Sequence, residues 1–200
     1  MIAASCLALV SSLAAATDVE LTGRYGGTTF SSEAKVGVPS NYGFVAGCYF
    51  VAIDVSGPEV LWRLRPVVSY EYHWNGGGID IKTRSNIVSL GLSRSFMLGY
   101  ARTSVALAAT HFSDTYDVLV EGDNRVDYVA NTWGVSIGID LRFKFFDHVD
   151  AVVGYKYLGR EKPLWEAKTS SGTPYSVEGR GGDHCISAGV SVTLGGVEHL

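Results

Sequence analysis

The chain has 200 residues, enough for one domain, and a formal net charge of −4 from 16 Lys and Arg against 20 Asp and Glu. This balance excludes the basic surface that nucleic-acid binding requires. The mean hydropathy is +0.15, yet no internal apolar run reaches the roughly 18 residues of a membrane-spanning helix. The apolar residues must therefore be dispersed along the chain.

The first sixteen residues resemble a secretory signal peptide. The segment MIAASCLALVSSLAAA is apolar and small, and it ends in an Ala-x-Ala site before Thr17. No Lys or Arg precedes the apolar run, so a core helix or strand is the alternative interpretation. We expect residues 1–16 to be a cleavable signal for export and residues 17–200 to form the mature domain.

After residue 17, bulky and small or charged residues alternate in eight segments. The clearest is NTWGVSIGIDLRF, where the odd positions from Trp133 to Phe143 are bulky and the even positions from Thr132 to Arg142 are small or charged. A period of two predicts a β-strand with two unlike faces. The predicted strands cover residues 18–28, 41–55, 60–75, 80–96, 100–117, 126–144, 149–161 and 182–195.

Short and long connections alternate between these strands. Short turns are expected near residues 56–58, 97–99 and 146–148, and long polar connections over residues 26–40 and 161–181. At the end with the long connections, one pair of strands is expected to turn at 75–78, and another to continue as a protruding hairpin over 115–127 that turns at 121–124. An even number of strands with turns at one end and longer loops at the other is typical of an outer-membrane barrel. The predicted fold is all-β, an eight-stranded antiparallel up-and-down transmembrane barrel.

The two faces of the strands indicate which side points inward. Small residues such as Gly134 and Ser136 share a face with the charges, and eight strands leave an interior just wide enough for side chains. The bulky face therefore points outward, to lipid. We expect aromatic residues to form girdles at both interfaces, from Trp62, Tyr70, Tyr72, Trp74, Trp133, Phe143, Tyr155 and Tyr157. The alternative is a soluble, lipocalin-like barrel with the apolar face inside.

Charged residues of both signs collect on the inward face. They are Glu20, Arg24, Asp54, Arg63, Arg65, Glu71, His73, Arg102, Asp140, Arg142, Asp150 and Lys156. Charges in a narrow, poorly hydrated space must be paired. The set predicts an ion-pair network that fills and orders the barrel, with a gated path for small solutes as the alternative.

One proline and two cysteines fall within the predicted strands. Pro66 lacks the backbone N–H that would donate a hydrogen bond to the neighbouring strand, so we expect a bulge or an internal polar partner there. Cys48 and Cys185 fall on strands separated by a third, too far apart for the roughly 4.4–6.8 Å spacing of a disulfide, which predicts two thiols.

Strand number, loop asymmetry, girdles and a mixed-charge interior together resemble the small outer-membrane barrels: the OmpA transmembrane domain, OmpX, OmpW and the opacity proteins. The resemblance covers about residues 17–195. It implies a monomer in the outer membrane, with lipid as its partner. It also implies a structural or adhesin-like role, in which the loops at 26–40, 115–127 and 161–181 bind a host or envelope ligand. The alternative is an OmpW-like channel for small or hydrophobic solutes.

A remote alternative is a lipid A-modifying hydrolase. His111 and Ser113 look like the His-x-Ser pair of lipid A deacylase barrels, and Asp114, Asp117 or Glu121 could orient the imidazole. The rest of that family's signature is not evident, and such a pair on a strand often arises by chance. We therefore expect no enzyme activity, no cofactor and no metal site.

Overall fold

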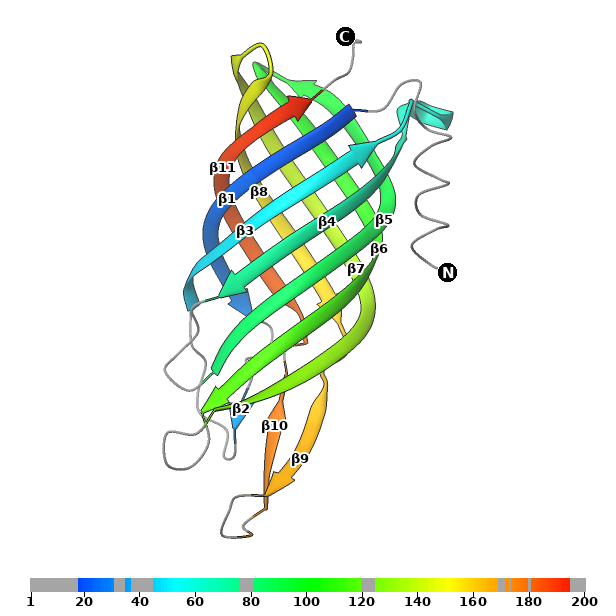
Figure 1. Cartoon of the computed structure of the whole chain (residues 1–200). Helices are drawn as coiled ribbons and strands as arrows, with labels where there is room; N and C mark the ends of the chain where they lie inside the picture. The colour runs from blue at the N-terminus through cyan, green and yellow to red at the C-terminus, as the bar shows by residue number, and fades with distance from the viewer. Residues whose placement is uncertain are drawn as a thin grey trace.

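The computed structural model describes residues 18–30, 35–36, 45–75, 81–119, 125–168, 172, 174–179 and 181–194. Eight antiparallel strands form a closed barrel in the order β1-β11-β8-β7-β6-β5-β4-β3 (Figure 1). They are β1 (Asp18–Phe30), β3 (Val45–Ser56), β4 (Arg65–Asn75), β5 (Ile81–Leu98), β6 (Ala101–Leu119), β7 (Arg125–Phe146), β8 (Val149–Arg160) and β11 (Asp183–Leu194). The predicted fold class and the eight predicted strands are confirmed.

One end of the barrel, here called the short-turn end, carries tight connections. Gly99 and Tyr100 join β5 to β6, with Gly99 at φ 61°, and Asp147 and His148 join β7 to β8. Gly99 takes this left-handed backbone without the steric penalty that a Cβ would bring. The first residue of β1 and the last residues of β11 lie at this end too, because Asp18 pairs with Ser56 and Val19 with Leu194.

The opposite end, here called the long-loop end, carries a second, smaller sheet. Its strands are β2 (Lys35–Val36), β10 (Pro174–Glu178) and β9 (Leu164–Lys168), paired in that order. Figure 1 shows this sheet beyond the barrel, on the side away from the short turns. The sequence predicted polar connections for these segments, and part of those connections is ordered strand. We call residues 161–182 with β2 the cap.

The strand β4 begins later than predicted. Residues 60–64 were expected to continue the alternation, but Leu61–Arg63 form a kinked turn, η1, in which Trp62 and Arg63 have left-handed backbone dihedrals. Pro66 is therefore the second residue of β4, where a missing donor is tolerated, and the register from Arg65↔Ser93 to Asn75↔Thr83 is continuous. Of the two expectations for Pro66, the bulge is therefore wrong, because the proline stands at the start of the strand rather than within it.

Inward glycines let neighbouring strands approach closely. A Cβ added to Gly134 on β7 would lie 1.9 Å from the carbonyl oxygen of Gly159 on β8. By contrast, a Cβ added to Gly23, on the outward face of β1, would meet nothing within 4 Å. The small residues that the sequence places on the inward face therefore match the tight curvature of an eight-stranded barrel.

Among the described residues, no helix is long and apolar enough to cross a membrane. The predicted signal peptide lies outside the described residues. Cys185 is a buried thiol on β11, and β1 separates that strand from Cys48 on β3, because Gly26 pairs with Cys48 while Thr28 pairs with Cys185. The side chain of Cys48 falls outside the described part of the chain.

Candidate functional site

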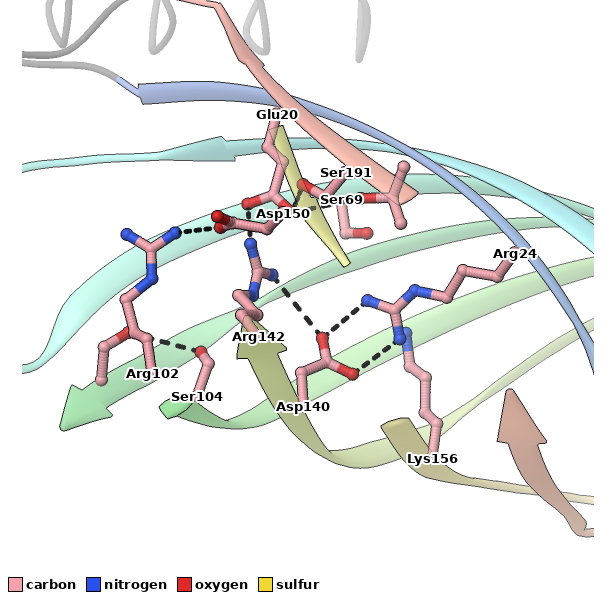
Figure 2. Close-up of polar contacts among 12 residues, drawn as sticks. Glu20, Arg24, Ser69, Arg102, Ser104, Asp140, Arg142, Asp150, Lys156 and Ser191 are labelled. Atoms are coloured by element: carbon pink, nitrogen blue, oxygen red, sulfur yellow. Dashed lines mark hydrogen bonds and ion pairs between the residues drawn. The ribbon is translucent and has the colours of Figure 1, made fainter. Parts of the chain in front are cut away.

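The half of the barrel interior toward the short-turn end holds a network of ion pairs (Figure 2). Arg24 of β1 donates two hydrogen bonds across the lumen to Asp140 of β7, at 2.6 and 2.7 Å. Arg142 donates to Glu20 of β1, and its second terminal nitrogen lies 3.6 Å from Asp140. Glu20 also accepts from Ser191 and, at 3.1 Å, from Thr22. Guanidinium groups thus cross-link β1 and β7, which are separated by two strands in the barrel.

A second group centres on Glu71, which is 3% exposed. Its carboxylate accepts from Lys156 of β8, and its other oxygen lies 2.8 Å from Nε2 of His73. The His73 ring stacks on Phe50 at 4.7 Å between centroids, and the Arg24 guanidinium lies 5.7 Å from the centroid of the Phe50 ring. A carboxylate so deeply buried requires these partners, because a lone buried charge is strongly unfavourable.

The network leaves a small cavity of about 120 Å³. Glu20, Arg24, Asp54, Glu71, Asp140 and Lys156 line it together with several serines. This is room for a few water molecules, since a liquid water occupies about 30 Å³. Arg102 and Asp150 pair at 2.6 Å, with Arg102 47% exposed, as expected for a pair near the opening of the lumen.

The other half of the interior is closed by a buried charge cluster that the sequence analysis missed. Arg160, at the end of β8, donates to Asp114 of β6 at 2.6 Å and to Asp183 of β11 at 2.7 Å. The three side chains are 1%, 0% and 3% exposed. The Arg160 guanidinium also lies 4.6 Å from the ring centroid of Phe112. We call these three charged residues the Arg160 cluster.

Two apolar layers flank the Arg160 cluster. The layer beside it consists of Ile87, Phe112, Leu158 and Cys185, each no more than 3% exposed. The layer beyond it consists of Tyr116, Val118, Ala130 and Val177, with Tyr128 and Trp165 packed against it. Trp165 of β9 contacts Tyr116 and Tyr128 at 5.3 and 5.5 Å between centroids. The cap therefore covers the inner face of the β6–β7 hairpin.

Two of the predicted lumen residues need separate comment. Arg63 was expected inside the barrel, but it precedes β4, has a φ of 60° and is exposed. That prediction is wrong, because the left-handed backbone at η1 breaks the alternation on which it depended. Arg65 is the first residue of β4 and shares the inward phase of Ser69 and Glu71.

The outer face carries aromatic side chains at two levels. Toward the long-loop end, Tyr25, Tyr49 and Trp74 stack in a row at 4.7 and 5.4 Å. This level also holds Tyr72, Trp133, Tyr155, Tyr157, His111 and His184. Toward the short-turn end lie Trp62, Phe96, Tyr100, Phe143, Phe145 and Phe146, all exposed. Tyr70 lies between the levels and donates to Asn86 at 2.8 Å.

The separation of these levels can be estimated on β7. Trp133 and Phe143 are 71% and 44% exposed and stand ten positions apart on the same face. Ten positions span about 34 Å along a strand, or about 26 Å along the barrel axis at a tilt of ~40°. Exposed Val135, Ile137 and Ile139 lie between them. This matches the roughly 25 Å apolar band of transmembrane barrels.

The His111–Ser113 pair lies on this outer face, and neither of the two predicted partners that the structure describes, Asp114 and Asp117, is placed to orient the imidazole. The His111 ring packs edge-on against Trp133 at 4.9 Å. Asp114 points to the other face of β6, into the Arg160 cluster, and Asp117 stands six positions, about 20 Å, along the strand from His111. Glu121 lies outside the described residues. No described group of three or more His, Cys, Asp or Glu is placed to hold a metal ion.

Comparison with known proteins bears on the fold. No family model matches the chain, and no curated protein matches it significantly. Among solved structures, it resembles Neisserial surface protein A, with a TM-score of 0.50 and 15% identity over 89% of this chain and 97% of that one. It also resembles a major outer membrane protein from Thermus thermophilus, with a TM-score of 0.59 and 8% identity over 89% and 99%.

A third likeness is to the outer membrane protein OprG from Pseudomonas aeruginosa, with a TM-score of 0.53 and 11% identity over 90% and 96% of the two chains. The chain has the fold of the small outer-membrane β-barrels. The resemblance inferred from its sequence is thereby confirmed. At identities of 8–15% the likeness concerns the fold alone.

Proposed function

We propose that the chain is an integral outer-membrane protein with a closed barrel, whose role is structural or surface-interacting through the long-loop end. The apolar outer band between two aromatic levels supports insertion in a bilayer. Outer-membrane barrels carry their short turns on the periplasmic side and their longer loops outside. By the same rule, the long-loop end of this barrel faces the cell exterior and the short-turn end faces the periplasm. The alternation of the strands and the fold of the neighbouring structures favour the same placement.

The observation that carries the closed-barrel proposal is the near-complete burial of the side chains in the half of the interior toward the long-loop end. The Arg160 cluster is at most 3% exposed, and Phe112 and Ile87 beside it are 0% and 1% exposed. A solute path would have to displace both a paired charge cluster and an apolar layer, each held by several strands. The cavity of about 120 Å³ lies on the other side of this barrier and argues for internal hydration rather than for a channel.

The cap and the β6–β7 hairpin supply the surface for a partner. Leu164, Glu166 and Lys168 of β9 are exposed, while Trp165 between them packs inward. On β7, Val126 and Val129 are 40% and 56% exposed beyond the barrel. Loops held on a rigid scaffold are where binding residues concentrate. Both segments are anchored through buried aromatic contacts, which favours recognition by a pre-formed surface.

A hydrolase role has less support. A catalytic triad needs the base within hydrogen-bond reach of both the nucleophile and the orienting group. The His111 ring instead packs on Trp133, and the nearest predicted carboxylate, Asp114, faces the other side of the sheet. We therefore propose that the chain is not an enzyme.

Membrane insertion is tested by folding the chain in detergent, comparing its migration in SDS with and without boiling, and floating it with liposomes. A heat-dependent shift and co-flotation are expected. Closure is tested separately in planar bilayers, where we expect no conductance steps. A soluble protein without a heat shift would contradict the membrane placement, whereas steady ion conductance from an inserted barrel would contradict closure alone.

The surface role is tested by displaying the chain on a non-adherent bacterium and measuring cell aggregation and adhesion to immobilised matrix proteins and glycans. The triple variant Leu164→Ser, Glu166→Lys, Lys168→Glu changes only exposed cap residues. The matched control is Lys144→Gln, an exposed residue at the short-turn end. Adhesion that is lost in the cap variant and kept in the control is expected, while equal adhesion in all three would contradict the proposal.

A further inference from the structure

The turn between β3 and β4 contains the two non-glycine residues with positive φ in the described chain. Trp62 has a φ of 58° and a ψ of 32°, and Arg63 has a φ of 60°. Residues with a Cβ avoid this left-handed region, and two in succession are rarer still. Such backbone outliers persist where the surrounding structure holds them, and they justify a hypothesis of function.

Hydrogen bonds hold this turn in place. The amide of Gly57 donates to the carbonyl of Pro66 at 2.9 Å, and the amide of Val60 donates to that of Leu64 at 2.7 Å. In a continued strand, Trp62 and Arg63 would point to opposite faces, and Arg63 would enter the lumen. The left-handed pair leaves both side chains exposed instead, Trp62 to 77%. The strained turn thus leaves an indole and a guanidinium exposed on consecutive residues at the rim of the barrel.

A second arginine comes from the neighbouring strand. Arg65 pairs with Ser93, so Arg94 lies one position beyond that pair, level with Leu64, on the outward and exposed face of β5. The exposed carboxylate of Glu59 belongs to the same turn. Two arginines against one glutamate leave the patch with a net positive charge.

We propose that Arg63 and Arg94, flanked by Trp62, bind the headgroup of an anionic phospholipid at the short-turn end of the barrel. This rests on the membrane placement proposed above, in which that end meets the periplasmic leaflet. A guanidinium binds phosphate oxygens in a bidentate manner, and an indole settles at headgroup depth. Charge complementarity selects an anionic headgroup over a zwitterionic one.

Native mass spectrometry of the full chain in detergent, titrated with phosphatidylglycerol or phosphatidylcholine, measures the first lipid bound. We expect phosphatidylglycerol to bind more tightly, and Arg63→Gln and Arg94→Gln each to weaken it about fivefold. The control Lys82→Gln removes one exposed cation at the long-loop end of β5 and is expected to change nothing. Equal binding of the two lipids, or equal weakening in the control, would overturn the proposal.

Arg63→Gly separates lipid binding from folding. Glycine accepts a φ of 60°, so this variant is expected to unfold about 2–4 °C higher while losing the same fivefold in phosphatidylglycerol affinity. A lower thermal midpoint would make Arg63 a structural residue and overturn the assignment. A chain that fails to float with liposomes contradicts the membrane placement, whereas one that floats without a lipid preference contradicts this inference alone.

Discussion

Replacing Arg160 by methionine tests whether the Arg160 cluster is as dry as its geometry indicates. The change keeps an unbranched side chain of similar volume and removes the guanidinium that Asp114 and Asp183 share at 2.6 and 2.7 Å. Two carboxylates at 0% and 3% exposure then lose their common counter-charge. Removing one partner of a buried ion pair costs about 3–5 kcal/mol.

For a domain of this length, such a loss lowers the thermal midpoint by about 6–20 °C. The midpoint is read in detergent from the SDS mobility of the folded and unfolded bands. The matched control is Arg102→Met, which breaks the 2.6 Å pair with Asp150 at 47% exposure of the arginine. An exposed pair contributes about 0–1 kcal/mol, so the control is expected to shift the midpoint by less than about 4 °C.

A triple variant identifies the cause of the loss. Arg160→Met with Asp114→Asn and Asp183→Asn removes all the charge, and replacing a buried ion cluster by neutral groups of similar volume is often neutral. We expect this variant to recover most of the stability lost in Arg160→Met. If Arg160→Met and Arg102→Met have equal midpoints, then water reaches the cluster and the closed-barrel reasoning is refuted.

Two further predictions concern packing. Gly134→Ala places a Cβ 1.9 Å from the Gly159 carbonyl oxygen and is expected to reduce the folded, SDS-resistant fraction strongly, whereas Gly23→Ala, with nothing within 4 Å, is expected to fold like the wild type. Trp165→Ala removes the contacts with Tyr116 and Tyr128. We expect this change to reduce the free energy of opening the cap by at least ~1.4 kcal/mol, which is a factor of ten in the population of the open cap. Trypsin should therefore cleave the cap at Lys168 about tenfold faster, and an unchanged rate would contradict the cap packing.

Alternation predicted the barrel because a period of two is a local property of the chain. It located the strands to within a few residues, except at β4, where two left-handed residues interrupt the pattern without a sequence signal such as glycine. The misplacement of Arg63 follows from that one interruption. The prediction for Trp62 is not affected, because its side chain is exposed both in the predicted strand and in the observed turn.

The Arg160 cluster was harder to predict for a different reason. Parity already puts Asp114 on the inward face of β6, opposite His111, and it also puts Arg160 on the face of Lys156 and Asp183 on the face of Ser191. The inward direction of each residue could therefore have been found, but not their meeting. Arg160 and Asp183 stand at the ends of β8 and β11, next to a segment that reads as a polar loop. Their meeting depends on the register of three strands, including the pairing Asp183↔Leu158, and registers are not local. Trp165 likewise becomes a core residue only when the cap folds over β6 and β7.

Side chains of the barrel strands, and not those of the cap, close the lumen. Ile87, Phe112, Leu158 and Cys185 come from β5, β6, β8 and β11, and the Arg160 cluster comes from three of these strands. The cap contributes Val177 and Trp165, which belong to the outer apolar layer alone. Because two further barriers lie beneath that layer, opening the cap by Trp165→Ala is expected to leave the inserted barrel non-conducting in planar bilayers. Conductance in this variant would mean that the cap is the seal, and that the paired charges beneath it admit ions.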